Sequence, residues 1–221
     1  MLALAMARKT APRGYHHGNL REALIKASIE LVEEGGPDAV SIREAARRAG
    51  VSPGAPFRHF PNRTVLMTAI AEQATHRLHE AIFEADDKAK TEPPLDRLRV
   101  MGRAYLRWAL DHPTHFAIVS NRNLIDYDSS ESMKRENGEL QALMSQLLEE
   151  AGAPAAAKLT ARALVYGLAR MHIDGHLPQW GGASPRQARS MMDAALDLFV
   201  AGLVSQPESS VRPARRPRSG P

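Results

Sequence analysis

The stretch from residue 41 to residue 63 gathers side chains that could bind a polyanion. Its arginines and histidine can donate hydrogen bonds to phosphate oxygens, and Ser41 and Ser52 add hydroxyl groups. Small residues, 53–55, follow Ser52 directly. Side chains of this size let the start of a helix enter the major groove of DNA, which is about 12 Å wide. The residue types therefore predict a nucleic-acid interface.

Two short helices would position these side chains. Ser41 and Glu44 fit a capping box at the start of the first helix, 41–49, which Gly50 ends. Ser52 followed by a proline is a typical start for the second helix, 53–59. Two capped helices joined by a glycine turn form a helix-turn-helix, although many helical proteins contain such a pair without binding DNA.

The charge is unevenly distributed along the chain. Residues 1–63 carry 10 Lys and Arg against 6 Asp and Glu, whereas residues 64–206 carry 15 against 18. A basic first part on an acidic body suggests that one end meets a polyanion, although solvated surfaces of mixed charge are the simpler explanation.

Composition excludes several other classes of protein. The chain has no cysteine, so it has no disulfide, cysteine-bound zinc or cysteine nucleophile, which suits a reducing cytoplasm. No apolar run approaches the ~18–20 residues of a membrane span. Walker, G-x-S-x-G and H-E-x-x-H motifs are absent from the sequence, so we expect no enzyme, catalytic residue or cofactor.

The helical period dominates between the two ends of the chain. Apolar residues recur at helical spacing, and glycines, prolines and capping residues divide the pattern into about nine helices, which predicts an all-α fold. The last two helices are expected over 155–176 and 184–204, and a polar loop over 120–131. The ends, a basic arm over 1–14 and a basic tail over 207–221, have compositions typical of disorder.

Residues 15–72 closely resemble the N-terminal domain of TetR-family transcriptional regulators. The resemblance includes the first three helices, the start Ser52-Pro-Gly54, the Arg-His-Phe ending at Phe60 and the capped fourth helix. It implies a DNA-binding domain over 15–72 and a ligand-binding and dimerisation domain over 73–206. It also implies a cytoplasmic homodimer that binds a palindromic operator as a repressor and responds to a small molecule. The alternative is a constitutive DNA-binding dimer without an effector.

The resemblance also implies which residues contact DNA. Phe57 stands where the family usually has a tyrosine whose hydroxyl binds phosphate, and Arg63 stands where it usually has a lysine. The full set is Ser41, Arg43, Ser52, Pro53, Gly54, Ala55, Phe57, Arg58, His59 and Arg63. Arg8, Lys9 and Arg13 would either reach the minor groove as an arm or remain a solvated tail.

The C-terminal part resembles the WHG subset of the family, with Val165-Tyr-Gly167 where that subset often reads Trp-His-Gly. Aromatic residues lie where the family builds its ligand cavity, although each could equally pack in the core: Phe83, Tyr105, Trp108, Phe116 and Tyr166. By the same resemblance, the last two helices pair with those of a second copy. The interface candidates there are Leu159, Ala163, Tyr166, Gly167, Met191, Ala195, Leu198 and Val200.

Histidines occur in three pairs at helical spacing: His76 with His79, His112 with His115, and His172 with His176. Such pairs can bind a metal ion. A chain with 9 histidines produces these spacings by chance, so we predict no metal site.

Overall fold

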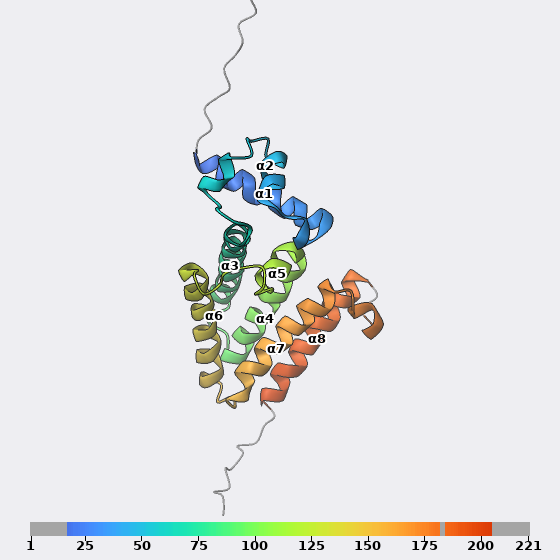
Figure 1. Cartoon of the computed structure of the whole chain (residues 1–221). Helices are drawn as coiled ribbons and strands as arrows, with labels where there is room; N and C mark the ends of the chain where they lie inside the picture. Colours follow the sequence, from blue (N-terminus) through green and yellow to red (C-terminus); the bar gives the residue numbers. More distant parts are fainter. Residues whose placement is uncertain (1–16, 182–183, 205–221) are drawn as a thin grey trace, which may run out of the picture. The chain divides into compact units, whose positions relative to one another are not determined.

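The computed structural model describes residues 17–181 and 184–204, with side chains from Leu20 onward. Figure 1 shows an all-α chain, as predicted, and the described residues form eight α-helices where about nine helices were expected. The helices are α1 (His17–Gly35), α2 (Ile42–Arg48), α3 (Arg63–Lys88), α4 (Pro94–Asp111), α5 (Pro113–Val119), α6 (Glu131–Glu150), α7 (Ala156–Ile173) and α8 (Pro185–Val204). The expected arm 1–14 and tail 207–221 lie outside the described residues.

Helix ends fall at the residues whose chemistry requires them. Gly36, which follows α1, adopts φ 78°, a left-handed conformation that favours glycine. Asn62 caps α3 by accepting a 2.9 Å hydrogen bond from the backbone N–H of Val65. Ser184 caps α8 through a 3.3 Å hydrogen bond from the backbone N–H of Gln187. Side-chain oxygens of Asn62 and Ser184 therefore each satisfy one backbone donor at the start of a helix.

The second helix of the helix-turn-helix is shorter than predicted. A single 3-10 turn, Ala55–Arg58, stands where an α-helix over 53–59 was expected. Pro56 lies inside this segment and has no N–H to donate, and Pro61 follows closely. Two prolines within six residues leave room for one tight turn rather than for an α-helix.

The chain divides into two compact units. The first comprises Met1–Ala74 and Thr114–Ser130, of which the structure describes residues from 17 onward. In its core, Leu24 of α1, Ala45 of α2 and Phe60 are buried. Thr114–Ser130 joins it through polar contacts as well, because Thr68 Oγ1 accepts from the backbone N–H of Asp126 at 2.9 Å. This unit therefore contains more of the chain than the 15–72 segment expected from sequence.

The second unit comprises Thr75–Pro113 and Glu131–Pro221, with α4 packed against α6, α7 and α8. Two ion pairs join α4 to α8: Arg103 donates to Asp197 at 2.9 Å, and Arg189 donates to Asp111 at 2.8 Å. Helices α7 and α8 lie side by side as an antiparallel hairpin (Figure 1). Helix α3 contributes residues to both units.

Candidate nucleic-acid interface

Ser41 caps α2 as the sequence predicts. Its hydroxyl oxygen accepts a 3.1 Å hydrogen bond from the backbone N–H of Glu44. The carboxylate of Glu44 turns to Arg47 rather than back to the start of the helix, so only one side of the capping box is formed. The Ser41 side chain is exposed, and its hydroxyl can still donate to an external acceptor such as a phosphate oxygen.

Two arginines near the helix pair are held by carboxylates of the chain. Arg47 donates to Glu44 at 2.9 and 2.5 Å, and Arg48 donates to Glu34 at 2.7 and 2.5 Å. These hydrogen bonds hold the pKa of the Glu34 and Glu44 carboxyls below the usual value and raise the pKa of both guanidinium groups. The charges of Arg47 and Arg48 are therefore already balanced within the protein.

Arg43 and Arg58 present the uncompensated positive charge. Both side chains are exposed, and neither makes a hydrogen bond or ion pair within the part of the chain that the structure describes. Arg43 lies in the first turn of α2, and Arg58 lies in the 3-10 turn. The two parts of the helix-turn-helix thus each carry one arginine with its full donor capacity available.

The small residues of the recognition segment face outward. Ser52, Pro53 and Gly54 are exposed, and a Cβ atom added to Gly54 would meet nothing within 4 Å. Exposed backbone with small side chains permits close approach to the edges of bases.

The rest of the segment alternates between inward and outward positions. Pro56 is buried, Ala55 and His59 are half-buried, and Phe57 is 46% exposed. Phe57 therefore lies at the surface beside Arg58 rather than in the core.

Arg63 has an internal role that the sequence did not indicate. Its guanidinium donates to the backbone carbonyls of Val40 at 3.0 Å and Pro37 at 2.7 Å, which ties the start of α3 to the turn before α2. A guanidinium has five N–H donors, so a further hydrogen bond to phosphate is still open to it. The phosphate contact of Arg63 stays a prediction.

The five aromatic residues expected to line a ligand cavity are divided between the two units. Phe116 belongs to the first unit, whereas Phe83, Tyr105, Trp108 and Tyr166 belong to the second. Tyr105, Trp108 and Phe116 are buried, and the other two are half-buried. Their part in a ligand site stays a prediction.

Two features of this aromatic group were not evident from the sequence. The guanidinium of Arg162 lies over the rings of Tyr105 and Tyr166, at 5.2 and 5.5 Å. Burial raises the pKa of the Tyr105 phenol, and the charge of Arg162 opposes that rise. The buried indole N–H of Trp108 has no hydrogen-bond partner among the described residues. An unpaired buried donor costs about 1–3 kcal/mol.

The interface candidates on α7 and α8 separate into two groups. Leu159 is 75% exposed and Leu198 is 76% exposed. Met191 and Ala163 are also exposed, and Ala195 and Gly167 are half-buried. Val200 is instead buried inside the protomer with Met192 and Leu196, so its proposed place at the interface is wrong: it lies on the opposite face of α8 from Leu198.

Both histidines of the first pair, His76 and His79, contact carboxylates. His76 Nδ1 lies 3.0 Å from Glu136 Oε1, and His79 Nε2 lies 2.6 Å from Glu139 Oε2, which joins α3 to α6. Within residues 17–181 and 184–204, no group of three or more histidine, aspartate and glutamate side chains is placed to hold a metal ion.

Sequence comparisons identify both parts of the chain. Residues 24–70 match the family described as bacterial regulatory proteins, tetR family, and residues 98–199 match the tetracyclin repressor-like C-terminal domain. The chain belongs to the TetR family. Its resemblance to the WHG subset stays a prediction, because the matching C-terminal description does not name that subset.

Curated relatives include an HTH-type transcriptional repressor. This TetR-family chain is 33% identical over 103 residues to the HTH-type transcriptional repressor Rv3405c of Mycobacterium tuberculosis, covering 46% of this chain and 54% of the relative. It is 27% identical over 132 residues to the nucleoid occlusion factor SlmA of Vibrio cholerae, covering 59% of this chain and 62% of that protein. The chain thus spans little more than half the length of these relatives.

Solved structures share the fold over most of the chain. A Rhodococcus sp. RHA1 protein of unknown function superposes with a TM-score of 0.71 at 29% identity, covering 87% of this chain and all of that chain. A tetR-family regulatory protein from Rhodococcus RHA1 gives a TM-score of 0.66 at 19% identity, covering 83% of this chain and 96% of that chain.

None of the described helices combines the length and apolar character needed to cross a bilayer.

Proposed function

We propose that this chain is a cytoplasmic transcriptional repressor that binds a palindromic DNA duplex as a homodimer and responds to a small-molecule effector. The observation that carries the DNA-binding part is the contrast among the arginines. Arg43 and Arg58 are exposed and unpaired in the described structure, whereas Arg47 and Arg48 are neutralised by carboxylates. Free cations beside an exposed, small-residue recognition segment suit a phosphate backbone flanking a groove.

Each part of the interface would have its own task. Ser41, Arg43, Arg58 and His59 would contact phosphates and set the register of the protein on DNA. The exposed backbone of 52–55 would approach the base edges, where sequence is read.

A homodimer is supported by the exposed leucines of α7 and α8. Leu159 and Leu198 are aliphatic side chains that water would surround in an isolated protomer. A two-fold dimer would bury each of these residues in both subunits and would present two recognition segments, which matches two operator half-sites.

Effector response is supported by the second unit. The unpaired indole N–H of Trp108 offers a buried donor within the aromatic group that the sequence indicated. Helix α3 contributes to both units, so a ligand that favours one conformation of the second unit would change the population of DNA-binding states.

The experiment is a DNA-binding titration with a duplex selected from a random library. Arg43→Ala and Arg58→Ala should each weaken binding and make the slope of log K against log salt shallower by about one unit per lost phosphate contact. Arg47→Ala is the matched control and should change the affinity much less, because Glu44 already holds that guanidinium. Equal losses of DNA affinity for all three variants would contradict the proposed interface.

A thermal-shift screen separates the effector-responsive repressor from a constitutive one. A compound that stabilises the protein and weakens operator binding supports effector response, since coupling between two sites is reciprocal. Compounds that stabilise the protein without changing its affinity for DNA would favour the constitutive dimer.

A further inference from the structure

A small cleft opens at the end of the α7–α8 hairpin, and none of its lining residues belongs to the group Phe83, Tyr105, Trp108, Phe116 and Tyr166. It has a volume of about 170 Å³. The lining residues come from the last turn of α7, the turn after it and the first turn of α8: His172, Gly175, Leu177, Pro178, Ser184, Pro185 and Ala188. All of them belong to the second unit.

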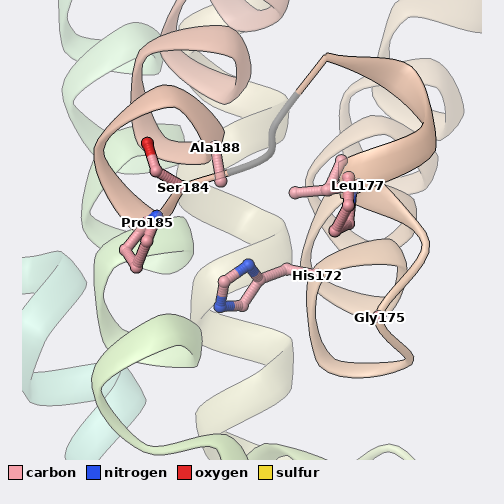
Figure 2. Close-up of a pocket in the computed structure, with 7 residues that line it drawn as sticks. His172, Gly175, Leu177, Ser184, Pro185 and Ala188 are labelled. Atoms are coloured by element: carbon pink, nitrogen blue, oxygen red, sulfur yellow. The ribbon is translucent and has the colours of Figure 1, made fainter.

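The imidazole of His172 is the polar group of this cleft that lacks a partner. Figure 2 shows its ring projecting into the space between the start of α8 and the turn at Gly175. The ring is half-buried and makes no hydrogen bond or ion pair with any residue that the structure describes. The Ser184 hydroxyl, by contrast, is already used to cap α8.

The walls around this imidazole are apolar. Leu177 and Ala188 are buried, and the rings of Pro178 and Pro185 complete the lining. A cavity of about 150 Å³ with apolar walls is large enough to bind benzene. The volume of the cleft thus fits one six-membered ring.

The charges near the cleft favour an anionic substituent on that ring. The cleft borders the first turn of α8, a helix of 20 residues whose N-terminal end carries a partial positive charge. The acidic group close in sequence, Asp174, is already bound by Arg170, and Asp111 of α4 is bound by Arg189, which follows Ala188 in α8. Imidazole has an N–H donor in either tautomer, and a carboxylate accepts it well.

We propose that this cleft binds a single-ring aromatic carboxylate, with the ring against Leu177 and Ala188 and the carboxylate accepting a hydrogen bond from His172. This inference goes beyond the proposed function, because binding here requires neither DNA nor the Trp108 region. The site is therefore tested on the full chain without DNA.

Benzoate is the probe, followed by calorimetric titration. The wild-type chain should bind it with a Kd of roughly 1 mM or tighter. Toluene, which has the ring without the charge, and acetate, which has the charge without the ring, should each bind at least tenfold more weakly. If acetate binds as tightly as benzoate, the protein has only a surface site for anions, and the proposal is overturned.

Three variants test the place of binding. His172→Gln should weaken benzoate binding about tenfold, and Ala188→Leu, which fills the cleft, should abolish it. His176→Gln is the matched control, because His176 is exposed and does not line the cleft. Thermal melting of each variant checks folding, and His172→Gln decides the question should Ala188→Leu not fold. Undetectable binding to the wild type, or equal affinity of His172→Gln and His176→Gln, overturns the inference.

Discussion

The guanidinium of Arg97 donates two hydrogen bonds, 2.9 and 2.8 Å long, to the two carboxylate oxygens of Asp86. Asp86 lies near the end of α3 and is only 4% exposed, and Arg97 lies in the first turns of α4. The hydrogen bond to Asp86 raises the pKa of Arg97, so the guanidinium remains charged. This pair joins two consecutive helices of the second unit across the turn between them.

Asp86→Asn should destabilise the protein by about 3–5 kcal/mol, because it leaves the guanidinium of Arg97 without its counter-charge in a buried place. For a chain of this size the thermal midpoint should fall by roughly 6–20 °C, which calorimetry or circular dichroism would measure.

Glu84→Gln is the control for this prediction. Glu84 also forms an ion pair, at 2.7 Å with Lys88, but both side chains are well exposed. Exposed pairs contribute little to stability, so this variant should melt close to the wild type. Similar losses of stability in the two variants would mean that the Asp86–Arg97 pair stabilises the protein no more than an exposed ion pair does.

Helix positions could be predicted from sequence because their causes are local. Gly36, Asn62 and Ser184 act on backbone groups within a few residues, so the pattern of caps and turns is visible in the chain itself. The apolar pattern is weaker at the start of α6, which follows the polar loop expected over 120–131. Its first turns bury Glu136 against His76, and a buried carboxylate interrupts the apolar pattern that periodicity detects.

Features that depend on distant residues could not be predicted. Nothing near Arg63 in sequence indicates that it reaches Pro37 and Val40. The same holds for the burial of Val200 and the exposure of Leu198, since only packing against α4 and α7 decides which face of α8 turns inward. The His172 cleft brings together three segments whose separate patterns carry no signal.

Phe57→Tyr should tighten DNA binding. The ring of Phe57 is exposed in the recognition segment, and the family usually has a tyrosine hydroxyl there for a phosphate. A recovered hydrogen bond to a charged acceptor contributes at most about 1–2 kcal/mol per subunit. Fluorescence anisotropy should show that the affinities for cognate and scrambled duplexes rise together, because phosphate contacts carry no sequence information. Unchanged affinity for both duplexes would place the new hydroxyl away from the backbone of DNA.

Gly102→Ala should destabilise the second unit. A Cβ atom at this position of α4 would lie 2.8 Å from Leu196 Cδ2 and 3.0 Å from Cδ1. Leu196 is buried and must shift, at a cost of about 1–3 kcal/mol that exceeds the gain of roughly 0.5–1 kcal/mol from replacing a helical glycine. Urea unfolding measures the difference. Gly138→Ala is the control: a Cβ atom at Gly138 of α6 meets open space, so this variant should be more stable than the wild type. If Gly102→Ala is also more stable than the wild type, the Leu196 side chain can move away without cost, and the prediction is wrong.

Gly167→Leu should dissociate the proposed dimer before it affects the protomer. A Cβ atom at Gly167 of α7 would meet nothing within 4 Å, so the protomer itself gives no reason for a glycine in the middle of this helix. Close approach of a second copy supplies such a reason, and a leucine there would cost about 1–3 kcal/mol of overpacking per site. Operator affinity should fall steeply, because a monomer holds only one half-site.

Sedimentation at low micromolar concentration, with circular dichroism in parallel, tests the Gly167 prediction. The variant should sediment as a monomer with unchanged helix content. Gly138→Leu is the matched control, since Gly138 of α6 also faces open space but lies outside the α7–α8 hairpin, and it should remain dimeric. A dimeric Gly167→Leu with normal DNA affinity would remove Gly167 from the interface. Loss of helix in that variant would mean that α7 meets a neighbour within its own protomer at this position.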